Sequence, residues 1–163
     1  MSGLNTLAGP NGSGKSTIIK ALIEGTDCDI DFSGSTERYL FDTEKMNPRI
    51  LSKPVGTPKE MALRIRGSFS SHGQTLQQQI LSLPANKQGV TLFIDEPETG
   101  QDFSSVKKIK KFLEIGCSKG YQIIVASHHP IFWKNTNLIE LEKKYTETVI
   151  KQMALTLTNK DSF

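Results

Sequence analysis

One nine-residue stretch constrains the fold of this chain more than any other part of the sequence. Residues 9–17, GPNGSGKST, fit the pattern G-x-x-x-x-G-K-[ST]. Residues 4–8, which read as a short strand, come before it, and residues 15–24 read as a helix that Gly25 stops. A strand, a glycine-rich loop and a helix in this order predict a loop that binds the phosphates of a nucleotide.

Each residue type in this stretch has a physical reason to be there. Its three glycines allow the backbone to turn N–H groups towards phosphate oxygens, and the following helix points its positive end at the same anion. We expect Lys15 to reach the β- and γ-phosphates and to act in catalysis, and Ser16 to ligate Mg²⁺. The residues expected to bind the nucleotide are Gly9, Asn11, Gly12, Ser13, Gly14, Lys15, Ser16 and Thr17. A chance match is the alternative, and the pattern would arise about once in a hundred chains of this length.

The composition describes a single soluble globular domain. The chain has 163 residues, of which 36% are hydrophobic and 23% charged, and its net charge is +3. It contains neither an apolar run of about 20 residues nor a secretory signal pattern, so a cytoplasmic protein is expected and a membrane is not an expected partner. Cys28 and Cys117 show no metal-site spacing and are interpreted as free thiols.

Strand and helix patterns alternate along the rest of the chain. Residues 26–70 read as a loop-rich insertion around one strand, 38–42, and a helix is expected over 71–83. The unbroken apolar runs 90–95 and 121–127 predict strands that are covered on both faces, and 137–141 suggests a third. Residues 103–116 predict an amphipathic helix with Val106, Ile109 and Leu113 buried, whereas 146–158 fits either a helix or a strand. The alternation predicts an α/β fold over residues 1–163 with a mainly parallel sheet.

Two acidic residues follow the apolar run 90–95. Ligands bind at the carboxyl ends of the strands in open α/β sheets, so Asp95 is expected to hold Mg²⁺ through its water shell. Glu96 would polarise the water that attacks the γ-phosphate. An ordinary acidic turn is the alternative interpretation of this pair.

Five motifs in order make the sequence resemble the ABC-type ATPase superfamily. They are GPNGSGKST, SSHGQ, LFIDEPE, ETGQD and VASHHP. SSHGQ lies where the family has its signature LSGGQ, so Ser71, Gly73 and Gln74 match, whereas Ser70 and His72 depart from the pattern. Asp102 and His128 fall at the positions of the D-loop aspartate and the switch histidine.

The resemblance implies a P-loop NTPase fold of the ABC type with a reduced helical subdomain. It also implies an ATPase that uses Mg²⁺ and forms a head-to-tail homodimer around two ATP molecules. Ser71, Gly73, Gln74 and Asp102 of one subunit would then contact the ATP bound to the other. His128 would sense the γ-phosphate and orient the attacking water, so the resemblance adds it to Glu96 and Lys15 as a catalytic residue. A helix-capping Ser71 and a structural His128 are the alternatives.

The sequence departs from the family in ways that bear on its role. The glutamine of the Q-loop has no match, which leaves Asp42 or Glu44 as stand-ins. Ser71 lies only 54 positions after Thr17, which is too short a separation for an SMC-type arm. DEPE with SHHP is more similar to soluble RecF- and SMC-like members than to transporter subunits. The ATP-binding subunit of a membrane transporter and a nucleotide-gated binding module with little turnover remain the rival hypotheses.

The sequence does not identify what the nucleotide cycle acts on. We expect a downstream partner protein, in a DNA-related or defence process. DNA stays open as a partner because Lys107, Lys108, Lys110 and Lys111 would form one face of a helix, although a solvated charged face is the alternative. Phe132 and Trp133 are interpreted as core residues.

Overall fold

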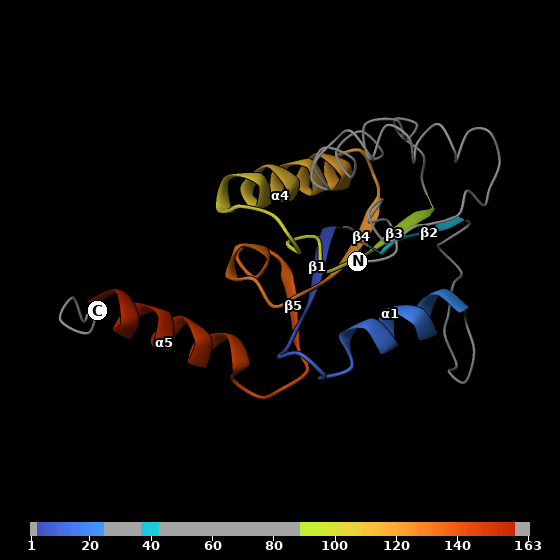
Figure 1. Ribbon diagram of the computed structural model, residues 1–163. Helices are drawn as coiled ribbons and strands as arrows, with labels where there is room; N and C mark the ends of the chain where they lie inside the picture. The colour runs from blue at the N-terminus through green and yellow to red at the C-terminus, as the bar shows by residue number, and fades with distance from the viewer. Residues whose placement is uncertain (1–2, 25–36, 43–88, 159–163) are drawn as a thin grey trace, which may run out of the picture.

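A computed structural model describes residues 3–24, 37–42 and 89–158 of the chain. Its centre is a five-stranded sheet in the order β2-β3-β4-β1-β5, and every pairing between neighbouring strands is parallel (Figure 1). The strands are β1 (Gly3–Ala8), β2 (Glu37–Asp42), β3 (Val90–Asp95), β4 (Gln122–Ser127) and β5 (Asn137–Glu140). The helices are α1 (Lys15–Glu24), α4 (Phe103–Ser118) and α5 (Tyr145–Thr158), and η1 (Pro130–Phe132) is a short 3₁₀ turn. The α/β sheet expected from the sequence is therefore present.

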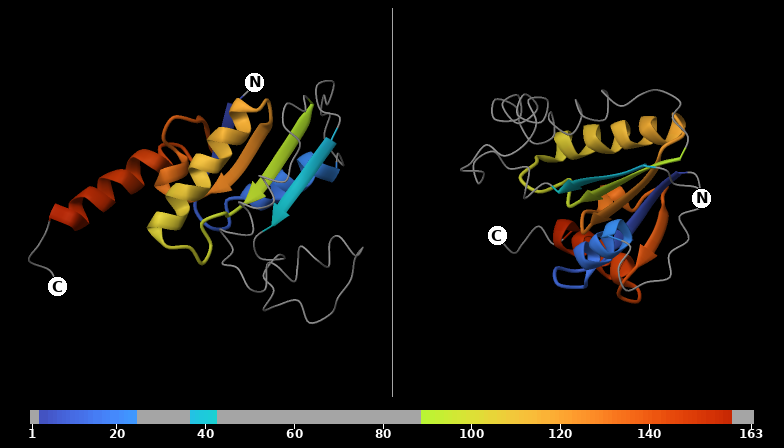
Figure 2. Two further views of the ribbon diagram at one scale, coloured as in Figure 1. Left: turned by 90° about the horizontal axis from the view of Figure 1, so that it is seen from above. Right: turned by 90° about the vertical axis from the view of Figure 1, so that its right-hand side faces the viewer.

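Strands β3 and β4 are mainly apolar because helices cover both faces of the sheet. Figure 2 shows α4 on one face and α1 on the other. Leu92 and Ile94 belong to the same buried cluster as Val106 and Leu113 of α4. Phe93, which points the opposite way, belongs to the cluster of Ile19 on α1. This alternation along β3 explains why its sequence shows no polar face.

Helix α4 confirms the predicted apolar stripe but corrects the predicted lysine face. Val106, Ile109 and Leu113 are buried, as expected, and Lys107, Lys108 and Lys111 are exposed. Lys110 is buried instead, and its ammonium group donates hydrogen bonds to the carbonyl oxygens of Ile131 (2.8 Å) and Lys134. The long aliphatic stem of a lysine can lie along apolar surface while its end reaches polar partners. The exposed face of α4 therefore carries one lysine fewer than the sequence suggested.

The strand predicted over 38–42 is confirmed and lies at the edge of the sheet. Strand β2 pairs with β3 in parallel, with Arg38 opposite Thr91 and Phe41 opposite Ile94. Phe41 is buried in the cluster that α4 covers. Part of the region interpreted as a loop-rich insertion thus belongs to the central sheet.

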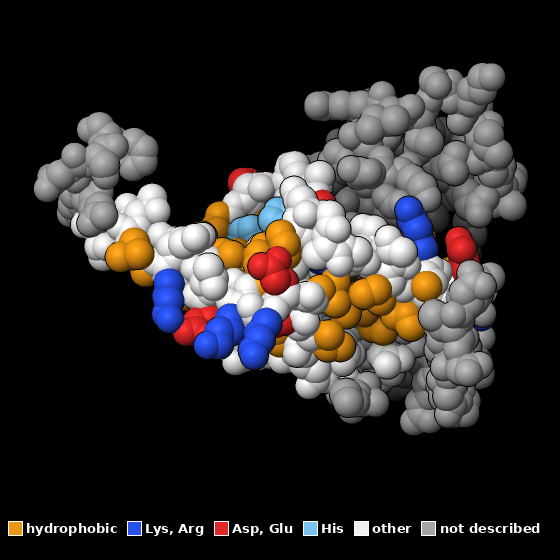
Figure 3. Space-filling model, turned by 90° about the horizontal axis from the view of Figure 1, so that it is seen from below, with side chains coloured by type: hydrophobic (Ala, Val, Ile, Leu, Met, Phe, Trp, Pro, Cys, Tyr) orange, Lys and Arg blue, Asp and Glu red, His pale blue; other side chains and the backbone are white. Residues whose placement is uncertain are grey.

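The ambiguous C-terminal stretch is the helix α5, which extends away from the sheet (Figure 1). None of its residues is buried. Leu155 and Leu157 are 61% and 78% exposed, and hydrophobic side chains are visible near the end of this helix in Figure 3. The helix is attached through Tyr145, whose ring contacts Trp133 edge to face with centroids 5.5 Å apart. Its first turn is held by Glu140, which accepts hydrogen bonds from the amide and the hydroxyl of Thr146 at 2.8 and 2.5 Å.

Several predictions concern residues outside the described part of the chain. These are the signature residues Ser71, Gly73 and Gln74, the helix over 71–83, Glu44, Cys28 and most of the insertion 26–70. Within the described residues, no helix combines the length and apolar character needed to cross a bilayer.

Candidate active site

The candidate site lies at one edge of the sheet, where parallel strands end together. The register places Ala8 of β1 opposite Ser127 of β4, and Asp95 of β3 opposite Ala126. The loops that follow β1, β3 and β4 therefore leave the sheet side by side, although residues 8, 95 and 127 are far apart in the sequence. This is the edge at which ligands bind in open α/β sheets.

The loop after β1 has the tight backbone that its sequence predicts. Gly12 and Gly14 have φ angles of 81° and 92°, in the left-handed region that glycine adopts without strain. A turn forms where the amide of Ser13 donates to the carbonyl of Pro10 at 3.2 Å. A Cβ atom on Gly9 would lie 2.5 Å from Oγ of Ser13, so no larger residue fits there without a shift.

Lys15 begins α1 and folds back over this loop. Its side chain is buried, and Nζ donates hydrogen bonds of 3.0 Å to the carbonyl oxygens of Gly9 and Pro10. The same Nζ lies 3.8 Å from Oε1 of Glu96. A positive charge is thus held at the loop, next to the amino-terminal end of a helix.

The remaining side chains of the loop are polar and differ in exposure. Asn11 and Thr17 are exposed, and Ser16 is half-buried. Oγ of Ser13 is buried and, among the described residues, has no hydrogen-bond partner. A buried hydroxyl of this kind suits a ligand oxygen, since buried polar groups are rarely left unpaired.

Glu96 follows β3 with a backbone that is unusual for its residue type. Its φ angle is 47°, and its amide donates to the carbonyl of Ala126 at 3.0 Å, so the loop after β3 is tied to β4. Its carboxylate oxygen Oε1 lies 3.8 Å from Nζ of Lys15 and 3.6 Å from Nδ1 of His128. A left-handed conformation costs a residue other than glycine about 1–2 kcal/mol. The strained backbone thus holds this carboxylate between two potential cations.

His128 comes directly after β4 and faces two carboxylates. Nδ1 lies 3.6 Å from Oε1 of Glu96 and 3.3 Å from Oε1 of Glu98. The side chain is 41% exposed, which leaves part of the ring accessible to a ligand. The structure therefore brings together Lys15, Glu96 and His128, the three residues predicted to be catalytic.

Glu98 is the residue of this site that the sequence analysis did not single out. Its side chain is only 5% exposed, and Oε1 accepts hydrogen bonds from Oγ of Ser127 (2.7 Å) and from the amide of His128 (3.0 Å). The acidic cluster DEPE was a signal for this residue, but only the tertiary contact between the β3 and β4 loops reveals what Glu98 contacts.

The segment after His128 is a turn that one of its own side chains caps. Nδ1 of His129 accepts a hydrogen bond from the amide of Ile131 at 3.2 Å and caps η1. Burial lowers the pKa of His129 below its usual value. Phe132 and Trp133 are buried, which confirms that they are core residues, and the ring of His129 lies edge to face with that of Phe132, with centroids 6.5 Å apart.

Asp102 lies at the amino-terminal end of α4 and is exposed. Its carboxylate accepts a hydrogen bond of 2.7 Å from the amide of Ser105, so Asp102 is the N-cap of this helix. The hydrogen bonds from the backbone and side chain of Ser105 hold the pKa of Asp102 below its ordinary value. A contact with a second subunit, which the resemblance implied for this residue, stays a prediction.

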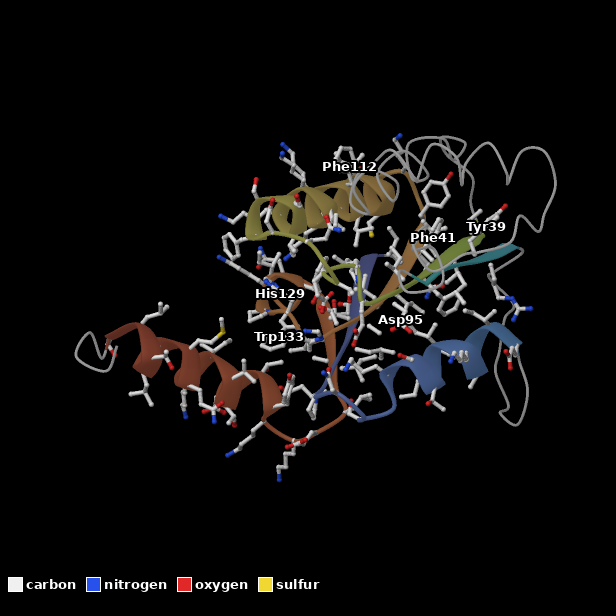
Figure 4. All side chains as sticks on the ribbon, viewed as in Figure 1. Tyr39, Phe41, Asp95, Phe112, His129 and Trp133 are labelled. Atoms are coloured by element: carbon white, nitrogen blue, oxygen red, sulfur yellow. The ribbon has the colours of Figure 1, made fainter. Side chains whose placement is uncertain are left out.

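Asp95 and Ser16 are the residues that could hold a metal ion. Asp95 ends β3 and is half-buried, and Figure 4 places it at the carboxyl end of that strand, close to α1. The described residues contain no group of three or more His, Cys, Asp or Glu side chains that could hold a metal ion. A hydroxyl and a carboxylate suit Mg²⁺, which takes one or two protein oxygens and completes its shell with water and phosphate. The donor set therefore fits a magnesium ion that arrives with a nucleotide.

Cys117 is a free thiol on α4, away from these loops. Burial, together with the charge of Glu114, raises its pKa to about 11. The thiol is therefore protonated at neutral pH and is a poor nucleophile.

The sheet and the loops at its edge have the α/β fold of P-loop NTPases, in the form found in ABC-type cassettes. Solved structures with this fold align along nearly the whole chain. CbiO1 from Clostridium perfringens, part of the ABC transporter complex CbiONQ, is 16% identical with a TM-score of 0.53, covering 99% of this chain and 84% of its own. A nucleotide-free ATP-binding cassette from an ABC transporter is 14% identical with a TM-score of 0.53, over 92% and 85% of the two chains.

A third structure, the inward-facing conformation of a putative metal-chelate type ABC transporter, is 15% identical with a TM-score of 0.52. It covers 95% of this chain and 76% of its own. At these identities the likeness concerns the fold, which confirms the predicted fold class. The closer similarity to RecF- and SMC-like proteins stays a prediction. No protein-family model and no curated protein matches the sequence.

Proposed function

We propose that this chain binds ATP with Mg²⁺ at the loop 9–17 and hydrolyses it. The observation that carries the proposal is the meeting of Lys15, Glu96 and His128 at one edge of the sheet. The three side chains come from α1 and from the loops after β3 and β4, and both Lys15 and His128 lie within 4 Å of the same oxygen of Glu96. A phosphate loop, a carboxylate and a histidine in this arrangement can bind a triphosphate and activate a water molecule.

Each residue has a distinct part in this proposal. The loop amides and Lys15 bind the phosphates, and the ammonium group stabilises charge that develops on the transferred phosphoryl group. Glu96 polarises the attacking water, and His128 orients that water and contacts the γ-phosphate. Ser16 and Asp95 would hold Mg²⁺, which neutralises charge on the phosphate oxygens when it is bound.

We further propose that the working form is a head-to-tail dimer around two ATP molecules. Ser71, Gly73, Gln74 and Asp102 of one subunit would contact the nucleotide held by the other, as the resemblance to ABC-type ATPases implies. Support comes from the amino-terminal end of α4, where Asp102 is exposed and the adjoining Phe103 is 60% exposed. Both side chains are therefore accessible to a second subunit. Such a dimer would act as a switch, because contacts to the γ-phosphate form across the interface and are lost with ADP.

Substitution of Glu96 tests both parts of the proposal. In Glu96→Gln we expect kcat for ATP hydrolysis to fall at least about 100-fold, since general-base catalysis contributes roughly 10²–10⁴-fold. Affinity for ATP should be kept, and the variant should sediment as a dimer with ATP and as a monomer with ADP. Glu147→Gln is the matched control, because Glu147 is exposed on α5, where it pairs with Lys151.

Two results would contradict this proposal. Unchanged hydrolysis in Glu96→Gln would remove Glu96 from the chemistry. A protein that stays monomeric with ATP at high concentration, yet turns over normally, would refute the dimer.

A subunit of a membrane transporter is the second candidate function. It is favoured by the names of the similar structures, which are described as components of ABC transporters. In that case Glu96→Gln with ATP should co-purify with an integral membrane protein. Retrieval of a soluble partner in the same experiment would favour the first candidate.

A further inference from the structure

The buried position of Glu98 is not explained by a gain in the stability of the fold. The carboxylate is buried between the loops after β3 and β4, and only one of its two oxygens accepts hydrogen bonds. Oε2 is buried and, among the described residues, has no hydrogen-bond partner. Removing a carboxylate from water is costly, and an unpaired buried oxygen adds to that cost. A buried acid of this kind calls for an explanation other than packing.

Oε1 of Glu98, the oxygen that accepts hydrogen bonds, fixes the segment that contains His128. Oε1 accepts from Oγ of Ser127 at 2.7 Å and from the amide of His128 at 3.0 Å. Oγ of Ser127 in turn accepts from the amide of His129 at 3.0 Å. One carboxylate oxygen thus fixes three consecutive residues at the end of β4.

The same oxygen lies beside the ring of His128. Oε1 of Glu98 is 3.3 Å from Nδ1, and Oε1 of Glu96 is 3.6 Å from the same nitrogen. The two glutamates are joined by a turn in which the amide of Thr99 donates to the carbonyl of Glu96 at 3.1 Å. A shift of Glu98 therefore changes where the imidazole lies relative to Glu96.

We propose that Glu98 is a positioning residue that holds His128 against Glu96, and that it acts through hydrogen bonds from the β4 loop. This inference rests on the proposed ATPase function and adds a residue to its machinery. Glu98 contacts neither the loop 9–17 nor α1 in any hydrogen bond among the described residues. Its substitution should therefore alter turnover and leave nucleotide affinity unchanged.

Two conservative variants distinguish the effect of the position of the Glu98 oxygen from the effect of the side-chain charge. Glu98→Asp keeps the charge but draws the oxygen back by one methylene group, away from Ser127 and His128. We expect kcat to fall by about 10–100-fold, since a displacement of about 1 Å in a catalytic group can cost 100-fold in rate. KM for ATP should change less than about threefold, a small shift in binding free energy. Glu98→Gln keeps the length and an acceptor oxygen and should recover most of kcat.

A double-mutant cycle with His128→Ala shows whether Glu98 acts through the histidine. If it does, Glu98→Asp should have little further effect on kcat once the imidazole is absent, because the two changes remove the same contribution. A merely structural role would lower kcat by the same factor in both backgrounds. Single-turnover measurements give the rate of the chemical step for all four proteins.

The matched control is Glu140→Asp. Oε1 of Glu140 also accepts two hydrogen bonds, both from Thr146, but they hold the start of α5 and not the β4 loop. The same shortening at Glu140 should leave kcat and KM unchanged.

The outcomes distinguish this inference from the proposed function. No turnover by the unaltered protein, or normal turnover in Glu96→Gln, overturns the function and the inference together. Normal hydrolysis by the unaltered protein with additive effects in the cycle overturns the inference alone. The inference also fails if Glu98→Gln is as slow as Glu98→Asp, or if KM rises while kcat is kept.

Discussion

Gly14 shows how the backbone of a single residue shapes the phosphate loop. Its φ angle is 92°, and a Cβ atom at this position would meet nothing within 4 Å. Substitution by alanine therefore acts through backbone strain alone. A residue other than glycine in such a conformation costs about 1–2 kcal/mol.

We expect Gly14→Ala to lower both the free energy of unfolding and the affinity for ATP. The strain should be relieved by movement of the loop, which turns the N–H groups away from the phosphates. Urea unfolding and equilibrium titration with a fluorescent ATP analogue measure the two effects. Affinity should fall at least about tenfold, which corresponds to 1.4 kcal/mol.

Gly120 offers a control with the same geometry. Its φ angle is also 92° and its Cβ position is also open, but it lies in the turn between α4 and β4. Gly120→Ala should lower stability by a similar amount and leave ATP affinity as it is. Equal loss of affinity in both variants would show that Gly14 affects binding only through global stability.

Lys110 joins two elements that the sequence does not bring together. Its ammonium group, on α4, donates to the carbonyl oxygen of Ile131 within η1 and to that of Lys134 after it. Burial is the main cause that lowers the pKa of Lys110 below 10.5, while Glu114 opposes the shift. The link holds the amino-terminal half of α4 against the segment that follows His128.

We expect Lys110→Met to lower the free energy of unfolding by about 1–3 kcal/mol, the usual cost of leaving buried polar groups unpaired. Methionine keeps much of the apolar stem, so the loss reports on the ammonium group. The effect should depend on pH. Since the pKa is lowered in the folded state, the unfolded chain binds this proton more tightly, and the lysine's contribution to stability rises as pH increases towards 10.5.

Thermal and urea unfolding between pH 7 and pH 10 would measure both effects. Lys111→Met, on the exposed face of the same helix, is the control and should change stability by less than about 0.5 kcal/mol. A similar loss in both variants would contradict the role given to Lys110.

At the scale of elements, local pattern predicted most of the fold. Residues 90–95 and 121–127 are apolar on both faces because helices cover both sides of the sheet, so their runs are unambiguous. Residues 146–158 fitted a helix or a strand equally well because α5 has no buried face. Burial of one face is what produces a regular spacing of apolar residues in the sequence. Strand β2 was recognisable from its composition, whereas its place in the sheet depends on a distant pairing with β3.

The residues of the candidate site also divide into those that the sequence predicts and those that it does not. Lys15, Glu96 and His128 were predicted because each belongs to a motif, and the shared edge of a parallel sheet brings them together. Glu98 and Lys110 could not be assigned because both are charged residues that are buried by contacts with another loop. Because charged residues are mostly exposed in folded proteins, the sequence alone predicts a surface position for both.

For the molecule as a whole, α5 is an appendage to the described fold. It has no buried residue, and within the described part of the chain Tyr145 and Thr146 attach it to Trp133 and Glu140. Isolated helices of fewer than about 12–15 residues are marginal in water. We therefore expect the central sheet and its two covering helices to fold without it.

We expect removal of residues 147–163 to leave the melting temperature within about 4 °C of the full chain, which corresponds to 1 kcal/mol or less. Differential scanning calorimetry provides the measurement. Phe132→Ala is the positive control, because Phe132 is fully buried and such a change costs about 3–5 kcal/mol. A truncated chain that melts as early as Phe132→Ala would show that α5 is part of the folding unit.

The left-handed backbone at Glu96 sets stability and chemistry against each other at one position. Glycine or asparagine would relax a φ angle of 47°, but neither carries a carboxylate. Directed evolution under heat selection alone should therefore enrich these two residues at position 96. The selected protein should have a higher melting temperature and no ATPase activity. Retention of the acid under such selection would contradict the energetic cost assigned to this backbone conformation.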